Sequence, residues 1–352
     1  WSSAQSVTVE AVEDLLFEAA THSTTLTHTV TGDGYDDVTA ADVNVSITEN
    51  DFRSIEFVTD FGNVSETAGT YDAMVRLNLV TNGVPGGTLS DAITAEVTLA
   101  SSSAVQYDDF MSLGAPFSFP AGTAHGATKA YTVSIINDRL LEGEESFSIT
   151  LIIYDNSGTV GPQGTHYVTI EDDETGTLTF SHTLVTLSEG DPTWTSTAKL
   201  VIDGTGSGDF QVGAPFSIEL TGSNGPELIG DYTIDTPTLT FPTGVGSPLY
   251  QPVEITVVDD RIVEGTESIE IRFDTFGLLT YIHDQITAYN TLLVTINDND
   301  SASVALSSGD DTVREDVGYY QKNAVLTIAA FGTGPVGLRQ DFEVPVSLTY
   351  NT

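Results

Sequence analysis

The chain has no cysteine and few basic residues, and both shortages argue against whole classes of protein. Its 352 residues include 10 Lys or Arg against 51 Asp or Glu, for a formal net charge of −41. Without cysteine there are no disulfides, thiolate nucleophiles or cysteine-ligated zinc sites. A surface this acidic repels phosphate backbones and anionic lipid, so we expect no nucleic-acid partner and no binding to membrane surfaces. No apolar run approaches the roughly 18 residues needed to span a bilayer.

The chain does contain enough apolar sequence for packed β-structure. Apolar residues make up 39% of it, with 16 Phe and 13 Tyr, which is too many for an acidic disordered chain. Apolar or β-branched residues alternate with polar ones in short runs, the pattern of strands buried on one face. These runs cover residues 131–136, 146–151, 253–258, 268–273 and 292–296. Residues 11–20 are helix-like in composition, but strand-like residues 7–9 and 43–47 flank them, so we expect an all-β protein.

The sequence repeats itself with a period of about 122 residues, which marks tandem domains. The segment IINDRLLEGEES at residues 135–146 corresponds to VVDDRIVEGTES at residues 257–268, 122 positions later. Three further pairs of motifs recur at similar spacing and in the same order: VSE (64–66) and LSE (187–189), FSFP (117–120) and LTFP (239–242), and VTIEDDE (168–174) and VTINDND (294–300).

This repeat predicts two complete domains between two incomplete ones. The complete domains are residues 53–174 and 175–300, and each ends on the acidic closing motif. Residues 1–52 resemble the C-terminal half of a repeat, and residues 301–352, with Glu315 in the early acidic position, resemble the N-terminal half of another. We interpret the chain, which starts at Trp1, as part of a longer array, with strand donation between chains as the alternative.

The motifs resemble those of the Calx-beta domain family. They comprise an early V-x-E, a Gly/Asp-Tyr step, a Phe-Pro, the acidic turn (I/V)-x-D-D-x-x-x-E-G-x-E and the closing V-T-I-x-D-x-D. Such domains are immunoglobulin-like sandwiches that occur in tandem in large extracellular bacterial surface proteins and in sodium–calcium exchangers. The resemblance covers residues 53–300 well and both ends in part. It implies a linear array of tandem immunoglobulin-like β-sandwiches.

The resemblance also implies Ca²⁺ as the cofactor, because calcium-binding members hold the ion with acidic residues from loops at one end of the sandwich. Independently of any family, Ca²⁺ takes about six to eight oxygens from carboxylates and carbonyls, and converging carboxylates repel one another without a cation. In residues 53–174 the candidate metal ligands are Glu66, Asp109, Asp138, Glu142, Glu145, Asp172, Asp173 and Glu174. In residues 175–300 they are Glu189, Asp231, Asp259, Asp260, Glu264, Glu267, Asp298 and Asp300.

Some positions depart from the calcium-binding pattern. Asn137 stands where the next repeat has Asp259, and Asn299 replaces a carboxylate in the closing motif. The first fragment offers a weaker set of acids: Glu13, Asp14, Glu18, Glu49 and Asp51. An alternative interpretation is that these acids only solubilise the loop ends or accept hydrogen bonds from turn backbones.

Signatures of catalysis are missing, so we predict that the chain is not an enzyme. The segment GTGPVG at residues 332–337 matches a dinucleotide-binding fingerprint, but strand-like residues 342–348 follow it instead of the required helix. We interpret it as a hairpin loop. There is no Gly-x-Ser-x-Gly nucleophile elbow and no His pair spaced for zinc. The acids recur once per repeat, as expected for a structural ion site and not for a single catalytic centre.

The predicted function is mechanical. An array of calcium-stiffened β-sandwiches supplies length and rigidity, so we expect a filament, stalk or surface-layer element outside the cell or on its surface. Its partners would be the neighbouring repeats of the same chain and, in a filament, other copies of itself. Two alternatives stay open: an adhesin module that binds a glycan or partner protein through its loop tips, and a non-catalytic region of a secreted enzyme.

Overall fold

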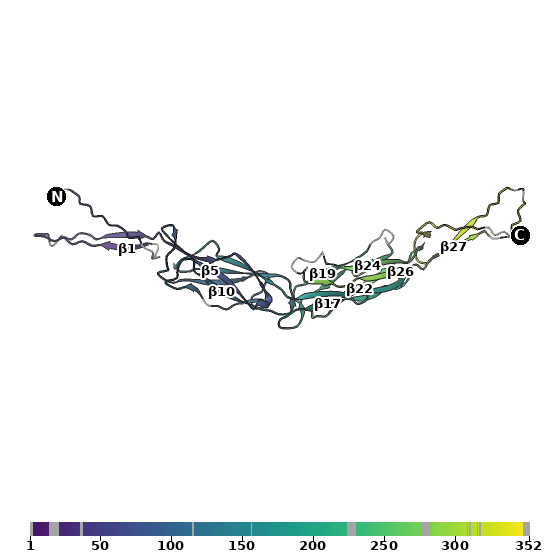
Figure 1. Cartoon of the computed structure of the whole chain (residues 1–352), viewed down its shortest axis with the longest axis horizontal. Helices are drawn as coiled ribbons and strands as arrows, with labels where there is room; N and C mark the ends of the chain where they lie inside the picture. Colours follow the sequence, from purple (N-terminus) through teal and green to yellow (C-terminus); the bar gives the residue numbers. More distant parts are fainter. Residues whose placement is uncertain are drawn as a thin grey trace. The chain divides into compact units, whose positions relative to one another are not determined.

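The structure is a computed structural model that describes residues 3–13, 21–35, 38–114, 116–155, 157–223, 230–275, 282, 284–307, 309, 311–314, 316 and 318–347. The chain forms two compact units. The first consists of residues 1–138 and 144–173, and the second of residues 139–143 and 174–352. Each unit is built from β-strands (Figure 1), which confirms the all-β prediction.

The first unit contains two sheets that face each other. One has the strand order β13-β3-β5-β10-β8, with β6 beside β5, and the other has the order β4-β14-β12-β7-β9. The strands of the first sheet are β13 (Thr159–Val160), β3 (Phe52–Phe57), β5 (Thr70–Thr81), β10 (Thr128–Ile135), β8 (Phe110–Ser112) and β6 (Val84–Pro85). The strands of the second are β4 (Phe61–Ser65), β14 (Thr165–Glu171), β12 (Glu145–Ile152), β7 (Ile93–Ser101) and β9 (Phe117–Phe119).

The second unit repeats the strand order of both sheets, with no counterpart of β6 beside β17, as the internal repeat predicts. Its sheets have the orders β20-β22-β17-β15-β25 and β16-β26-β24-β19-β21. The first sheet comprises β20 (Tyr232–Ile234), β22 (Leu249–Val257), β17 (Trp194–Asp203), β15 (Thr175–Phe180) and β25 (Ile286–Ala288). The second comprises β16 (Leu184–Ser188), β26 (Leu292–Asn297), β24 (Glu267–Asp274), β19 (Phe216–Gly222) and β21 (Thr238–Phe241).

Alternating burial along the strands places a hydrophobic core between the two sheets of each unit. In β24, Ile269, Ile271 and Phe273 are buried while the residues between them are not, as period-2 side-chain direction requires. Phe273 stacks on Phe180 of the opposite sheet with ring centroids 4.0 Å apart. In the first unit Phe147 stacks on Phe110 of the opposite sheet in the same way, with ring centroids 4.1 Å apart. The core therefore joins sheet to sheet in both units.

Short strand pairs lie outside the sandwiches. In the second unit, β11 (Leu140–Leu141) pairs in parallel with β18 (Gln211–Val212), and β23 (Ile262–Val263) pairs in parallel with β29 (Gly337–Leu338). A hairpin of β27 (Ser301–Leu306) and β28 (Ala324–Ala329) follows β26. In the first unit, β1 (Thr21–Leu26) pairs with β2 (Val43–Thr48).

Two local predictions are wrong. Residues 7–9 form no strand, and residues 342–347 form none either. Near residues 342–347 the strand lies earlier in the sequence: β29 begins at the last glycine of the GTGPVG motif. Residues 14–20, which include Asp14 and Glu18, lie outside the described residues, as does Glu315. Within the part of the chain that the structure describes, we find no helix long and apolar enough to cross a membrane.

Candidate metal centre

The acidic residues of the second unit gather in two groups on the loops that follow or precede its strands. The Glu189 cluster consists of Glu189, Asp260 and Asp300, and the Asp231 cluster consists of Asp231, Glu264 and Glu267. Within each cluster every residue offers a carboxylate oxygen within 4.8 Å of those of the other two. Six of the eight acids predicted for residues 175–300 thus come together in two sets of three.

Strand pairing assembles the Glu189 cluster. Because β16 runs parallel to β26 and places Ser188 opposite Asn297, the residues that follow the two strands emerge side by side. The Glu189 backbone N–H donates to the Asn297 carbonyl at 3.0 Å. Asp260 comes from the turn between β22 and β23, where its Oδ1 accepts a hydrogen bond from the Ile262 N–H at 2.8 Å. The cluster therefore joins loop ends from both sheets of the sandwich.

Two carboxylate oxygens of the Glu189 cluster are buried without a hydrogen-bond partner. Glu189 is 6% exposed and Asp300 is 9% exposed, and neither Oε2 of Glu189 nor Oδ2 of Asp300 has a partner in the described residues. A buried carboxylate without a partner is costly. These oxygens are the ones that a cation would stabilise.

The remaining predicted acids of this loop shape the backbone around the cluster. Asp298 accepts hydrogen bonds from the N–H groups of Asp300 at 2.6 Å and Glu264 at 2.5 Å. Asn299 donates through its amide nitrogen to the Glu189 carbonyl at 2.9 Å and to Asp259 at 3.2 Å. The departure from a carboxylate at Asn299 thus leaves a residue that ties two loops together.

The GTGPVG motif has a packing role in this unit. Gly332 has φ +75°, a conformation that glycine adopts readily, and a Cβ at this position would meet the Asp259 backbone oxygen at 2.5 Å. The Thr333 N–H donates to the same oxygen at 3.3 Å. The first glycine of the motif therefore lets a loop pack closely on the acidic turn.

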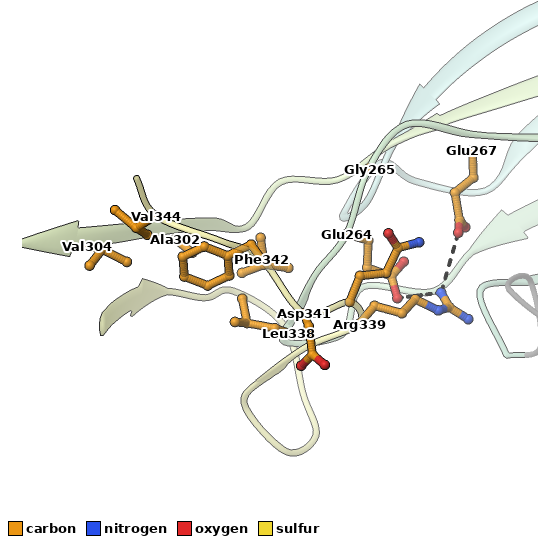
Figure 2. Close-up of a pocket in the computed structure, with 12 residues that line it drawn as sticks. Glu264, Gly265, Glu267, Ala302, Val304, Leu338, Arg339, Asp341, Phe342 and Val344 are labelled. Carbon is orange, nitrogen blue, oxygen red and sulfur yellow. Dashed lines mark hydrogen bonds and ion pairs between the residues drawn. The ribbon is translucent and has the colours of Figure 1, made fainter. Parts of the chain in front are cut away.

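Sequence analysis missed one charged member of the site. Arg339, just after β29, donates to Asp231 Oδ2 at 2.9 Å and to Glu264 Oε1, and it lies 3.6 Å from Glu267 Oε1. Figure 2 shows its side chain directed towards Glu264 and Glu267. Arg339, Glu264 and Glu267 line one side of a pocket of about 670 Å³ whose other side is apolar. The apolar side consists of Ala302, Val304, Leu338, Phe342 and Val344.

Burial and mutual repulsion raise the pKa values of Glu189 and Glu264, one carboxyl group in each cluster. The pKa of Glu189 rises from 4.5 to about 8, mainly because burial disfavours its charge and further because Asp298 and Asp260 lie near it. Burial likewise raises the pKa of Glu264 to about 7, with Arg339 acting in the opposite direction and Asp231 adding to the rise. Both groups are thus held in surroundings that favour a cation.

The first unit places its acids in the corresponding loops. Glu66 lies in a 3₁₀ turn (Glu66–Ala68) after β4, and one of its carboxylate oxygens is within 4.8 Å of an oxygen of Asp172. Asp109 and Asp138 likewise offer oxygens within 4.8 Å of each other. Glu66 accepts a hydrogen bond from the Asp138 N–H at 3.0 Å. Burial raises the pKa of Glu66 to about 7; the hydrogen bond from the Asp138 N–H opposes this rise, and the charges of Asp172 and Asp138 add to it.

The other predicted ligands of residues 53–174 have different surroundings. Asp173 accepts a hydrogen bond from the Asn137 side chain at 2.8 Å, and Glu145 is the first residue of β12. Glu142 and Glu174 belong to the second unit. There Glu174 is completely buried, and a Cβ on Gly204 would meet its Oε1 at 2.2 Å.

The weaker acidic set of the first fragment lies partly outside the described residues. Its described members, Glu13, Glu49 and Asp51, line one hollow of about 410 Å³ in the first unit together with His22. Asn50 donates to Glu13 at 3.3 Å, and the Asp51 N–H donates to Glu49 at 2.9 Å. Here the acids accept local hydrogen bonds from the turn.

The chemistry of the Glu189 cluster fits a hard divalent cation. All its donors are carboxylate oxygens, the ligands that Ca²⁺ prefers, at bond lengths of about 2.3–2.6 Å. Two ligands on opposite sides of such an ion lie about 4.6–5.2 Å apart, and the oxygens here lie within 4.8 Å of one another. No thiolate donor is available for a softer metal, because the chain has no cysteine.

Comparison with known proteins places the chain in a family. The model of the Calx-beta domain matches residues 48–174 and 171–300. Similar solved structures include CBD12 from CALX1.2 (15% identity, 69% of this chain and 100% of that chain, TM-score 0.31) and the apo-form Calx CBD1 domain (22%, 35% and 98%, 0.28). FdeC, an Escherichia coli adhesin, matches at 10% identity over 72% of this chain and 68% of that chain, with a TM-score of 0.24.

No curated protein matches the chain. The family-model matches together span residues 48–300, which is 253 of the 352 residues, and the two units share one strand order. The chain therefore belongs to the Calx-beta family and contains two consecutive Calx-beta domains.

Proposed function

We propose that this chain is a calcium-stiffened, non-enzymatic segment of an extracellular or cell-surface protein, in which Ca²⁺ bound by the acidic loops holds each sandwich rigid. The observation that carries the proposal is the pair of unpartnered oxygens, Glu189 Oε2 and Asp300 Oδ2, buried within one carboxylate cluster. The sixteen acids predicted from the sequence are the proposed ligands and their supports. Tandem Calx-beta domains and an all-oxygen donor set support the choice of ion.

The position of the cluster explains how an ion would stiffen the unit. Glu189 and Asp300 follow β16 and β26 of one sheet, while Asp260 follows β22 of the other. Asp300 Oδ1 also accepts a hydrogen bond from the Phe331 N–H at 2.6 Å. An ion at this point would cross-link the two sheets and restrain the segment that follows the sandwich. The carboxylates, which repel one another without a cation, would then hold the loops together.

The role that follows is that of a filament, stalk or surface-layer element. In this proposal residues 53–174 and 175–300 are the complete repeats, and residues 1–52 and 301–352 are partial ones. Neighbouring repeats are the main partners, and other copies of the chain assemble with them through divalent ions. Extracellular calcium modules work at Kd values of about 10⁻⁴–10⁻³ M, which suits loops with this many carboxylates.

Calcium titration calorimetry on the whole chain tests the proposal. Glu189→Gln removes one carboxylate ligand from the cluster and is expected to weaken calcium binding at least about tenfold, or about 1.4 kcal/mol. Glu219→Gln makes the same chemical change at an exposed position of β19 and should leave binding unchanged. Absence of calcium binding by the unaltered chain at millimolar calcium would refute the proposal, and so would equal affinities for all three proteins.

Small-angle X-ray scattering tests the mechanical part separately. If calcium stiffens the array, chelation with EDTA should broaden the distribution of interatomic distances in solution, and added calcium should restore it. Glu219→Gln should follow the unaltered chain, whereas Glu189→Gln should need more calcium to recover. Identical profiles with and without calcium would show that ion binding, even if present, does not supply rigidity.

A further inference from the structure

Backbone pairing between two short strands, and not the contacts of its own side chain, fixes where Arg339 lies. The parallel pair of β23 and β29 places Val263 opposite Leu338. The Arg339 N–H then donates to the Val263 carbonyl at 3.2 Å, and the Gly337 N–H donates to the Arg261 carbonyl at 3.2 Å. The guanidinium group is thereby held beside Glu264 of the acidic turn.

From this position the guanidinium group is the cation of the Asp231 cluster. It forms ion pairs with all three carboxylates of the cluster. The side chain of Glu264 is 4% exposed and that of Asp231 is 9% exposed, against 24% for Arg339. Figure 2 shows the Arg339 side chain directed towards Glu264 and Glu267, with Phe342 and Val344 on the opposite side of the pocket. The charge that the cluster needs is already present in the chain.

The equivalent position one repeat earlier carries no such cation. There β11 pairs with β18 in the same parallel register, with Leu141 opposite Val212. The next residue, Gly213, donates its N–H to the Leu141 carbonyl at 3.0 Å, just as Arg339 does to Val263. A Cβ at Gly213 would meet the Cγ of Glu142 at 2.2 Å. The same pairing of short parallel strands thus places a glycine beside the acidic turn of residues 53–174 and an arginine beside that of residues 175–300.

We propose that Arg339 is the resident cation of the Asp231 cluster, so that this cluster takes no calcium while Arg339 is in place and becomes a calcium site when Arg339 is removed. The inference rests on the proposed function, because it divides the acids of one repeat into a cluster that binds calcium and a cluster that the chain itself neutralises. The acidic turn of the repeat at residues 175–300 is consequently held against residues 337–339 at every calcium concentration. Arginine suits this role because it stays charged at all physiological pH values and spans two carboxylates with its planar group.

Electrostatics and geometry both keep calcium from this cluster. An ion bound to Asp231 and Glu264 would lie within a few ångströms of the guanidinium group, and two cations at that distance repel strongly in a partly buried site. The oxygens that would coordinate the ion already accept hydrogen bonds from Arg339. Calcium therefore binds this cluster only after the arginine side chain leaves, whereas the Glu189 cluster has no Lys or Arg bound to its three carboxylates in the described residues.

Counting bound calcium ions tests the inference. Equilibrium dialysis of the whole chain against millimolar radioactive calcium gives the number of ions per chain for the unaltered protein, Arg339→Gly and Arg339→Gln. Both variants are expected to bind one ion more than the unaltered chain, and Arg339→Lys is expected to bind the same number. Arg314→Gly is the matched control, because Arg314 is exposed and, among the described residues, pairs with nearby Asp316; its count should not change.

Arg339→Gln keeps the length of the side chain, so the test stands even if Arg339→Gly perturbs the β23–β29 pair. Circular dichroism confirms that each variant retains its β-structure. Calcium binding to the unaltered chain with no extra ion in either neutral variant would overturn this inference and leave the proposed function intact. An extra ion in Arg339→Lys would overturn it too, because charge would then not be the cause. No calcium binding by any of the proteins would overturn both.

Discussion

In EDTA, the second unit is expected to become less stable as the pH rises from about 5 to 8.5, the reverse of ordinary acid denaturation. The cause is Glu189, whose pKa is about 8 in the folded chain against an ordinary value of 4.5. Between these two values the folded state binds a proton that the unfolded state has released. The free energy of unfolding therefore falls with rising pH throughout this window.

The size of this effect follows from the width of the window. At about 1.4 kcal/mol for each pH unit, ionising Glu189 would cost at most about 5 kcal/mol, and relaxation of the loop with screening by salt brings this to the order of 3 kcal/mol. Glu264, whose pKa of about 7 has the same cause, adds to the fall. Thermal unfolding in EDTA at intervals of half a pH unit measures this fall in the free energy of unfolding.

Calcium should reverse the trend. Because calcium requires the carboxylates in their charged form, binding releases the protons, and the affinity for calcium rises with pH up to about 8. Glu189→Gln should therefore have opposite effects in the two solutions at pH 8.5, raising the melting temperature in EDTA and lowering it in calcium. Glu219→Gln should change neither. A melting temperature in EDTA that rises with pH would contradict the argument.

The repeat and the alternation of apolar residues predicted most of this fold because both are local or periodic signals. All five period-2 runs are strands in the structure, as β10, β12, β22, β24 and β26. The period of about 122 residues predicted that the two sandwiches share one topology. The failures lie in short apolar stretches without a partner strand, residues 7–9 and 342–347, where alternation alone cannot form a sheet.

The candidate site was only partly predictable. Spacing identified the acidic turns, but it did not separate Asp260, whose carboxylate joins the Glu189 cluster, from its neighbour Asp259, which accepts a hydrogen bond from Asn299. Arg339 was missed because its relation to Glu264 depends on the pairing of β23 with β29 across about 75 residues of sequence. One signal was available: it is among only 10 basic residues in the chain, so each one has many carboxylates to meet.

Phe147→Ala is expected to destabilise the first unit by about 3–5 kcal/mol, a large part of the stability of a single domain. Phe147 of β12 is 1% exposed and stacks on Phe110 of the opposite sheet, which is fully buried, with ring centroids 4.1 Å apart at 12°. Truncation leaves a cavity between two sheets whose other side chains are already packed, and such a cavity collapses only in part. The loss is therefore greater than the transfer free energy of the ring alone.

Phe61→Ala is the matched control, since it makes the same change in the neighbouring part of the same sheet. Phe61 of β4 is 66% exposed and stacks on the exposed ring of Tyr167, so its loss should cost about 1 kcal/mol or less. Denaturant unfolding followed by hydrogen exchange in β5 and β12 reports on the first unit by itself. Because this core is apolar, the difference between the two variants should be the same in calcium and in EDTA. A difference that appears only in calcium would mean that the ion, and not the aromatic pair, holds the two sheets together.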